Sequence, residues 1–185
     1  MKTTILKYMA YMMLPLLFSL SACKRDDDDA DDPHGENEEE LITTVEVGFT
    51  NSASNTHSHY RWVDADGAGG SNPVIDTIFL DTNASYSVEL EFLDESGEMV
   101  DDITEEIKSE SKDHIICFDL ATDKVTISRT DSDGQYGIGL QSTWSTTDAI
   151  KSSATISLKH QPDVKDGTCN PGETDVEVTF PLVIQ

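Results

Sequence analysis

Alternation between apolar and polar side chains is the feature of this sequence that most limits its fold. The last run is the clearest, because Val176, Val178, Phe180, Leu182 and Ile184 alternate with other residues almost to the end of the chain. Successive side chains of a β-strand point to opposite faces, so this period of two predicts strands with one buried and one exposed face. Such strands need a second layer to cover their apolar face. Further runs with this period are Val45–Phe49, Tyr86–Phe92, Val125–Ile127, Ile138–Leu140 and Ala154–Leu158.

Turn-forming residues separate the alternating runs, at 66–67, 94–97, 131–134 and 170–172. Strand, turn and strand at this spacing predict an all-β fold, an antiparallel immunoglobulin-like β-sandwich. One stretch favours a short helix, from Asp101 to about Asp113, where Ile103 and Ile107 lie four residues apart behind acidic capping residues. We therefore expect residues 41–185 to form one sandwich domain, with one of the two tryptophans in its core.

The first 22 residues have the order of an export signal peptide, in which Lys2 and Lys7 precede an apolar stretch over 9–18 and small residues follow. The apolar stretch is too short to span a bilayer as a stable helix. Leu20-Ser21-Ala22-Cys23 resembles a bacterial lipobox. The resemblance implies cleavage before Cys23 and lipidation of Cys23, whose acyl chains, such as palmitate, would anchor the protein in the outer membrane.

Residues 23–40 form an acidic stretch, since positions 24–40 contain ten carboxylates and almost no apolar side chain. Such a segment cannot bury enough surface to offset its ordering entropy, so we expect a lipidated, disordered linker. The segment Lys24-Arg25-Asp26-Asp27-Asp28 also resembles the surface-export signal of lipoproteins from the Bacteroidetes, which implies the cell surface. The alternative is a solubilising linker alone, with the protein on the periplasmic face of the outer membrane.

The charge of the chain excludes one class of partner. The net charge is −24, and it becomes −26 when residues 1–22 are removed, because that segment contains two lysines and no acidic residue. A surface this acidic repels phosphate backbones and anionic lipid. We therefore expect that the protein does not bind nucleic acid and that it contacts the membrane only through its lipid anchor. Cations and basic partners remain compatible with this charge.

Cys117 and Cys169 are the other two cysteines of the chain. Exported proteins enter an oxidising compartment where two thiols often pair, so we expect a disulfide. Closing a loop of this length stabilises a fold by ~4 kcal/mol in the chain-entropy model. The alternative is two separate thiols, with Cys117 acting as a small apolar side chain in its apolar run.

His57-Ser58-His59 is the first candidate site, on a predicted strand. Residues two apart point to the same side of a strand, so both imidazoles could bind one Zn²⁺ or Cu²⁺ ion. Two ligands do not complete a site, and His34, His114, His160 or nearby carboxylates would have to complete it. The alternative is a pair of polar residues on a solvated strand face.

Two Asp-rich turns, Asp64-Ala65-Asp66-Gly67 and Asp131-Ser132-Asp133-Gly134, are candidates for Ca²⁺, which prefers oxygen ligands from flexible loops. Both lack the later ligands of an EF-hand, and Asp-Gly is also the usual chemistry of a tight hairpin. We favour hairpin turns. Motifs of catalysis are also missing, since the sequence has no Gly-x-Ser-x-Gly elbow, no His-Glu-x-x-His and no phosphate-binding glycine loop. The protein is therefore predicted not to be an enzyme.

Several segments are spread over nearly all of the mature chain: Pro33-His34-Gly35-Glu36 through Glu38-Glu39-Glu40-Leu41-Ile42-Thr43-Thr44-Val45, then Arg61-Trp62-Val63-Asp64-Ala65-Asp66-Gly67, Leu93-Asp94-Glu95-Ser96, Asp102-Ile103-Thr104-Glu105-Glu106-Ile107 and Gly172-Glu173-Thr174-Asp175-Val176-Glu177-Val178-Thr179-Phe180. Together they resemble a family of small Bacteroidetes lipoproteins of unknown function, often labelled hypothetical lipoproteins or type 1 periplasmic binding fold proteins. The resemblance implies an envelope lipoprotein and supplies no catalytic or binding residue. A periplasmic binding fold needs strands that alternate with helices, whereas this sequence predicts almost only strands.

These observations favour a non-catalytic envelope lipoprotein that acts as a binding module. It would capture a metal ion or another nutrient and pass it to an outer-membrane transporter or another envelope protein. The alternative is a structural or protein-interaction module of the cell surface, which the sandwich pattern and the incomplete sites also fit. A pocket lined by His57, His59 and another ligand would favour the first hypothesis, and a flat exposed sheet edge would favour the second.

Overall fold

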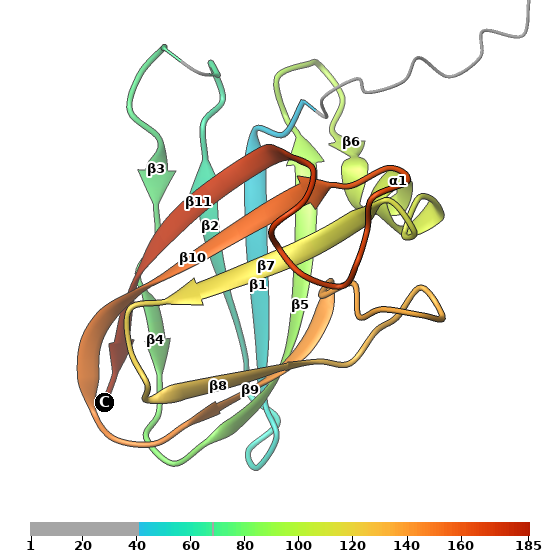
Figure 1. Ribbon diagram of the computed structural model, residues 1–185. Helices are drawn as coiled ribbons and strands as arrows, with labels where there is room; N and C mark the ends of the chain where they lie inside the picture. The colour runs from blue at the N-terminus through green and yellow to red at the C-terminus, as the bar shows by residue number, and fades with distance from the viewer. Residues whose placement is uncertain (1–40, 68) are drawn as a thin grey trace, which may run out of the picture. The chain divides into compact units, whose positions relative to one another are not determined.

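A computed structural model describes residues 41–67 and 69–185 of the chain. The predicted signal peptide, Cys23, the acidic linker and His34 lie outside the described residues. Within those residues, no helix has the length and apolar character needed to cross a membrane. The described part is two packed β-sheets with one short helix, so the prediction of an all-β sandwich is confirmed (Figure 1).

The larger sheet, sheet A, is antiparallel throughout, and it contains both of the first two strands of the domain. Its order is β3 (Val74–Ile75), β2 (His57–Val63), β1 (Thr44–Asn51), β5 (Ser85–Asp94), β9 (Gln141–Thr146) and β8 (Val125–Arg129), and β6 (Asp101–Asp102) pairs with β5.

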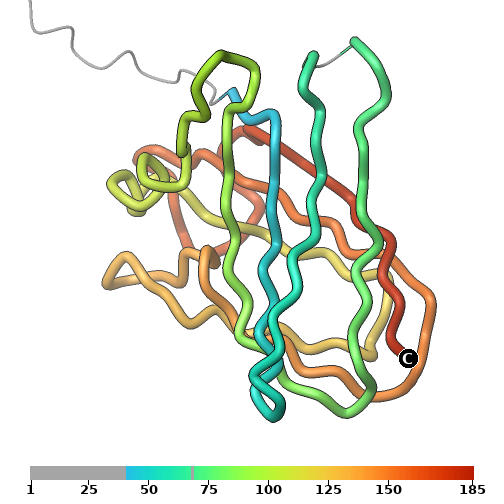
Figure 2. The backbone as a smooth tube through the Cα atoms, turned by 180° about the vertical axis from the view of Figure 1, so that it is seen from behind, coloured from blue at the N-terminus to red at the C-terminus, as the bar shows by residue number. Residues whose placement is uncertain are grey.

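The smaller sheet, sheet B, has the order β4 (Ile78–Leu80), β11 (Glu173–Ile184), β10 (Ile150–His160) and β7 (His114–Leu120). Its pairs are antiparallel except for β4 with β11, which is parallel. Figures 1 and 2, taken from opposite sides, show sheet B lying across sheet A with its strands oblique to β1, β2 and β5. The last strand and the first strands of the domain therefore face each other across the core.

The core lies between the sheets and follows the alternation in the sequence. All five apolar residues of the final run are buried, and so are the alternating apolar residues of β1 and β5. Trp144 is fully buried, with its ring edge-on to Phe49 at 5.3 Å and to Phe118 at 5.8 Å between ring centroids. This confirms the prediction of one core tryptophan, whereas Trp62 is only partly buried against the core.

The helix α1 (Ile103–Ser109) is shorter than the predicted stretch 101–113. Asp101 and Asp102 pair with the end of β5 instead, and the Asp102 carboxylate accepts a hydrogen bond from the Thr104 N–H as the N-cap. The residues after Ser109 form a turn that leads into β7. Ile103 and Ile107 are buried as their spacing predicted.

The β7 strand is the edge of sheet B, and the connection between β8 and β9 covers that edge. The Ile116 N–H donates to the Ile138 carbonyl oxygen at 2.8 Å, and the Arg129 guanidinium donates to the Ile116 carbonyl oxygen. Burial lowers the pKa of Arg129, although Asp131 opposes this shift. These bonds join sheet B to a segment of sheet A at the side of the sandwich where β7 lies.

Replacing Trp144 by Ala is expected to lower the free energy of unfolding by about 3–5 kcal/mol, because a fully buried indole leaves a cavity between the sheets. Urea denaturation followed by circular dichroism measures this loss. The control is Phe79→Ala on the half-exposed face of β4, which is expected to change the free energy of unfolding by less than about 0.5 kcal/mol. Equal losses in the two variants would contradict this account of the core.

Candidate metal centre

His114 and His160 face each other across two paired strands of sheet B. The register of β10 and β7 pairs Ile156 with Phe118, Leu158 with Ile116 and, at the end, His160 with His114. Because side chains two apart share a face, both histidines continue the row that points into the core. Their rings are stacked, with centroids 4.7 Å apart and an angle of 12° between the planes.

His114 is almost fully buried, at 1% exposed, and its two ring nitrogens have different surroundings. Nδ1 lies 3.2 Å from the backbone carbonyl oxygen of Glu110, which can only accept, so Nδ1 carries the proton. Nε2 is buried and has no hydrogen-bond partner. Burial lowers the pKa of His114, while the hydrogen bond to Glu110 opposes this shift, so the ring is neutral at neutral pH. The Nε2 lone pair is therefore available to a ligand.

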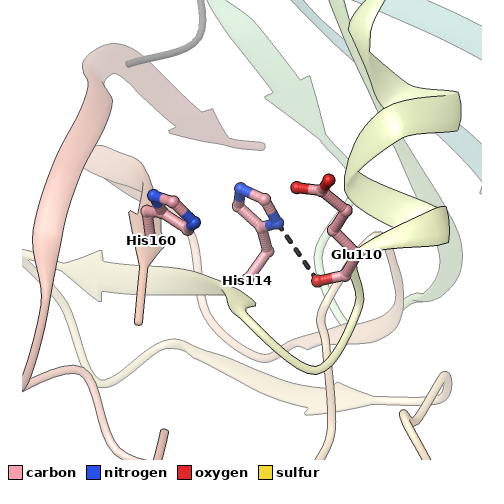
Figure 3. A group of neighbouring side chains, drawn as sticks. All are labelled: Glu110, His114 and His160. Atoms are coloured by element: carbon pink, nitrogen blue, oxygen red, sulfur yellow. Dashed lines mark hydrogen bonds between the residues drawn. The ribbon is translucent and has the colours of Figure 1, made fainter. Parts of the chain in front are cut away.

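Glu110 is the third member of the group, in the turn between α1 and β7. A carboxylate oxygen of Glu110 and one ring nitrogen from each histidine all lie within 4.8 Å of one another. Figure 3 shows the three side chains in a row, with His114 between the half-buried His160 and the exposed Glu110. Among the described residues, this is the group of three His, Cys, Asp or Glu side chains whose ligand atoms all lie that close to one another.

One rearrangement separates this geometry from a bound metal centre. Zn²⁺ binds imidazole nitrogen at about 2.0–2.1 Å along a lone pair in the plane of the ring. The lone pairs of two stacked rings run side by side, so one ring has to turn before both nitrogens reach the same ion. His160 is only half-buried at the end of β10, so its ring has more room to turn than that of His114. Water or another donor would complete four-coordination.

The loop between β10 and β11 holds the strand ends that carry the histidines. Gln161, directly after His160, is fully buried, and its N–H donates to the carbonyl oxygen of Asp113, directly before His114. The Gln161 side-chain amide donates to the carbonyl oxygens of Thr168 at 3.0 Å and Pro171 at 2.8 Å. One buried glutamine thus connects both ends of this loop to the turn that precedes β7.

A disulfide ties the same loop to β7. Cys117 and Cys169 lie at disulfide distance, with Cα atoms 6.0 Å apart, which confirms the predicted pairing. Cys117 lies three residues after His114, and its parity on β7 is opposite to that of Ile116 and Phe118, so its side chain points to the other face of sheet B. The disulfide therefore limits how far the loop can move from the histidine pair.

A buried ion pair fixes the loop at a third point. The Lys165 ammonium lies 2.6 Å from a carboxylate oxygen of Asp133 and donates to the carbonyl oxygen of Ser111 at 2.6 Å, and both charged side chains are only 4% exposed. Burial alone would raise the pKa of Asp133. Hydrogen bonds from Lys165 and from the Tyr136 and Gln135 N–H groups outweigh burial and lower the pKa to about 2.

The predicted pair His57 and His59 lies elsewhere, on the exposed face of β2 in sheet A. Two of the additional ligands named from the sequence, His114 and His160, do come together, but they do so with Glu110 and not with the β2 pair. Glu110 was missed because it follows a short helix in a chain with many carboxylates. The shared parity of His114 with Ile116 and Phe118 was a usable signal that its side chain points inward.

The Asp-rich turns use their carboxylates for backbone hydrogen bonds. Asp133 accepts from two N–H groups of its own turn, Asp131 accepts from the Gly139 and Gln141 N–H groups, and Asp66 accepts from the Ser71 N–H. Gly134 has a φ of 97°, as a tight turn with glycine requires. These contacts support the interpretation of the two segments as turns.

Comparisons with known proteins add no family. No protein-family model matches the chain, and no curated protein and no solved structure matches it.

The Asp133–Lys165 pair should make folding sensitive to acid. Between about pH 4 and pH 2 the unfolded chain binds a proton on Asp133 while the folded protein keeps the carboxylate ionised, so the stability present above this range is lost as the pH falls. Over this range, the free energy of unfolding of Asp133→Asn is expected to fall by about 2 kcal/mol less than that of the parent protein. Urea unfolding at several pH values measures the difference. Asp123→Asn on the exposed surface is the control, and a parent-like acid slope in Asp133→Asn would contradict the assignment.

Proposed function

We propose that this chain is a non-enzymatic, lipid-anchored envelope protein whose sandwich captures a transition-metal ion at Glu110, His114 and His160. The observation that carries the proposal is the buried Nε2 of His114, which has no hydrogen-bond partner. Leaving a buried polar atom without a partner costs about 1–3 kcal/mol, and a metal ion bound to its lone pair would remove that cost. The stacked second imidazole and the adjacent carboxylate supply the other donors.

The donor set favours Zn²⁺ or Cu²⁺. Imidazole nitrogen suits zinc, copper and nickel, whereas Mg²⁺ and Ca²⁺ prefer sites made of oxygen ligands alone. The hydrogen bond from His114 Nδ1 to the Glu110 carbonyl is the kind of contact that orients a metal-binding histidine and selects its tautomer. Gln161, the disulfide and Lys165 hold the loop between β10 and β11. This loop in turn keeps the strand ends that carry both histidines in place.

The location proposed for this function rests on the N-terminal sequence. The lipobox-like segment ending at Cys23 supports an anchor in the outer membrane, and the acidic segment after it, which resembles a surface-export signal, supports a place at the cell surface. The net charge of −24 of the whole chain attracts cations. Together with the resemblance to small Bacteroidetes lipoproteins, these features support a protein that collects a metal ion and passes it to an outer-membrane transporter.

A second candidate function is a protein-interaction module of the cell surface. It is favoured by exposed apolar side chains at the ends of both sheets, where β3 and β4 lie: Val74 is 71% exposed, Ile75 40% and Phe79 48%. Exposed apolar residues on edge strands are a common feature of protein contacts. Absence of metal binding, combined with copurification of an envelope protein that is lost in Phe79→Asp, would favour this candidate.

Metal capture is tested by titrating the full chain, purified in detergent, with Zn²⁺ and Cu²⁺ in competition with a chromophoric chelator. His160→Ala removes a half-buried ligand and is expected to weaken the tighter binding event by at least about 100-fold, more than the loss of a supporting residue costs. Glu110→Gln is expected to weaken it less, because the amide oxygen still donates electrons.

The matched control is His57→Ala together with His59→Ala, which removes two imidazoles far from this centre along the chain. It is expected to leave the tighter event unchanged, and circular dichroism checks that each variant folds. Tight binding that survives His160→Ala in a folded protein would overturn the proposed function.

A further inference from the structure

The outer face of sheet A has a hollow over its two most central paired strands. The hollow has a volume of about 310 Å³, and the residues that matter for its chemistry are Glu46, Gly48, Thr50, His57, His59 and Glu89. Figure 2 looks onto this side of the molecule, where β1 runs between β2 and β5. Val45, Val47 and Phe49 of β1 point into the core, so Glu46, Gly48 and Thr50 point to the opposite, solvated face.

Gly48 creates the hollow. It pairs with His59 on one side and with Glu89 on the other, so no side chain separates these two residues. A Cβ atom at this position would lie 3.3 Å from Cε1 and 3.4 Å from Nδ1 of His59, which places the imidazole over the glycine. Glycine inside a strand often marks such a close approach. The imidazole of His59 therefore leans toward the strand that carries Glu89.

Both histidines of β2 are held through the same ring nitrogen. Nδ1 of His59 lies 2.7 Å from a carboxylate oxygen of Glu46, and Nδ1 of His57 lies 2.9 Å from the Thr50 hydroxyl oxygen. A carboxylate that accepts from Nδ1–H fixes the tautomer in which Nε2 carries the lone pair, an arrangement typical of metal-binding histidines. Thus Nε2 is the ring nitrogen that these contacts leave to a ligand.

The charges around the hollow favour a cation. Glu46, Glu89 and Glu91 line it. Two basic side chains lie beside these carboxylates: Arg61 is 3.4 Å from one oxygen of Glu46, and Lys108 lines a neighbouring depression together with Glu89 and Glu91. Three carboxylates beside two imidazoles produce a negative potential in a shallow, polar depression. Nitrogen and oxygen donors together again suit zinc or copper better than calcium.

From this arrangement we infer that the hollow over Gly48 is a second metal-ion site, which binds a divalent transition metal through Nε2 of His59, the Glu89 carboxylate and His57. It goes beyond the proposed function because it shares no residue with the Glu110, His114 and His160 group. The site is weaker than that group, since exposed side chains of Glu89 and His57 have to turn and become ordered around the ion. In this site both histidines of the His57-Ser58-His59 motif bind the metal ion, and Glu46 positions the ring of His59.

Isothermal titration calorimetry with Zn²⁺ on the full chain in detergent tests this inference. The parent variant is His160→Ala, because it lacks the first centre and isolates the second. It is expected to retain a weak binding event near one ion per chain. Adding His59→Ala is expected to weaken that event at least about tenfold, and Gly48→Ala should also weaken it, because the added Cβ displaces the His59 ring.

Glu46→Gln separates positioning from ligation. It is expected to weaken the event less than His59→Ala, and with Cu²⁺ the electron paramagnetic resonance spectrum should still show coupling to imidazole nitrogen that His59→Ala reduces. The control is Thr126→Ala, an exposed residue of β8 on the same face of sheet A, which should change nothing.

The possible results distinguish this inference from the proposed function. No weak event in His160→Ala, or a weak event that His59→Ala leaves unchanged in a folded protein, overturns the second site and leaves the first standing. A single event that is lost with His59→Ala and retained in His160→Ala overturns the first centre and supports the second.

Discussion

Packing of sheet A against sheet B is the interaction on which the other features of the domain depend. Neither sheet can cover its own apolar face, and the rings of Phe49, Trp144 and Phe118 meet edge to face between them. This packing requires β10 and β7 to pair in the register that turns Ile156 and Phe118 inward. The same register places two histidines side by side where the apolar row ends. The candidate centre is therefore a direct extension of the core.

Burial gives the histidine pair chemical properties that an exposed pair lacks. Connecting loops are normally mobile and open to water, yet the loop after β10 is held by a buried glutamine, a disulfide and a buried ion pair. Each restraint acts within a few residues of a donor: Gln161 follows His160, Cys117 follows His114 by three positions, and Lys165 bonds to the residue after Glu110. These restraints hold the backbone that carries the donors, so less chain entropy is lost when an ion binds.

The exposed histidine pair on β2 is ordered by a different set of contacts. There, ordering comes from side chains of the neighbouring strand β1, since Glu46 and Thr50 each hold one Nδ1. Space comes from Gly48, which leaves room above the sheet for an imidazole. Exposure makes this site accessible, and it also raises the cost of ordering long side chains. The two groups would therefore differ mainly in affinity, with the buried one binding more tightly.

The sequence by itself determined most of the long strands, the two-layer fold and many inward-facing residues, because the period of two is a local property of each strand. The run Ile138–Leu140 was wrongly predicted as a strand, since it lies in the connection between β8 and β9, and the short strands β3, β4 and β6 were not predicted. The sequence also placed His57 and His59 on one face, and it supported the pairing of Cys117 with Cys169 through the number of cysteines. It overestimated the helix, since Asp101 and Asp102 pair with the end of β5, and local pattern does not reveal this pairing. Only the tertiary structure decided that His114 meets His160 and Glu110, and that Gly48 separates His59 from Glu89. The physical reason is that strand order and register depend on which apolar faces pack together, and this packing involves residues distant in the chain.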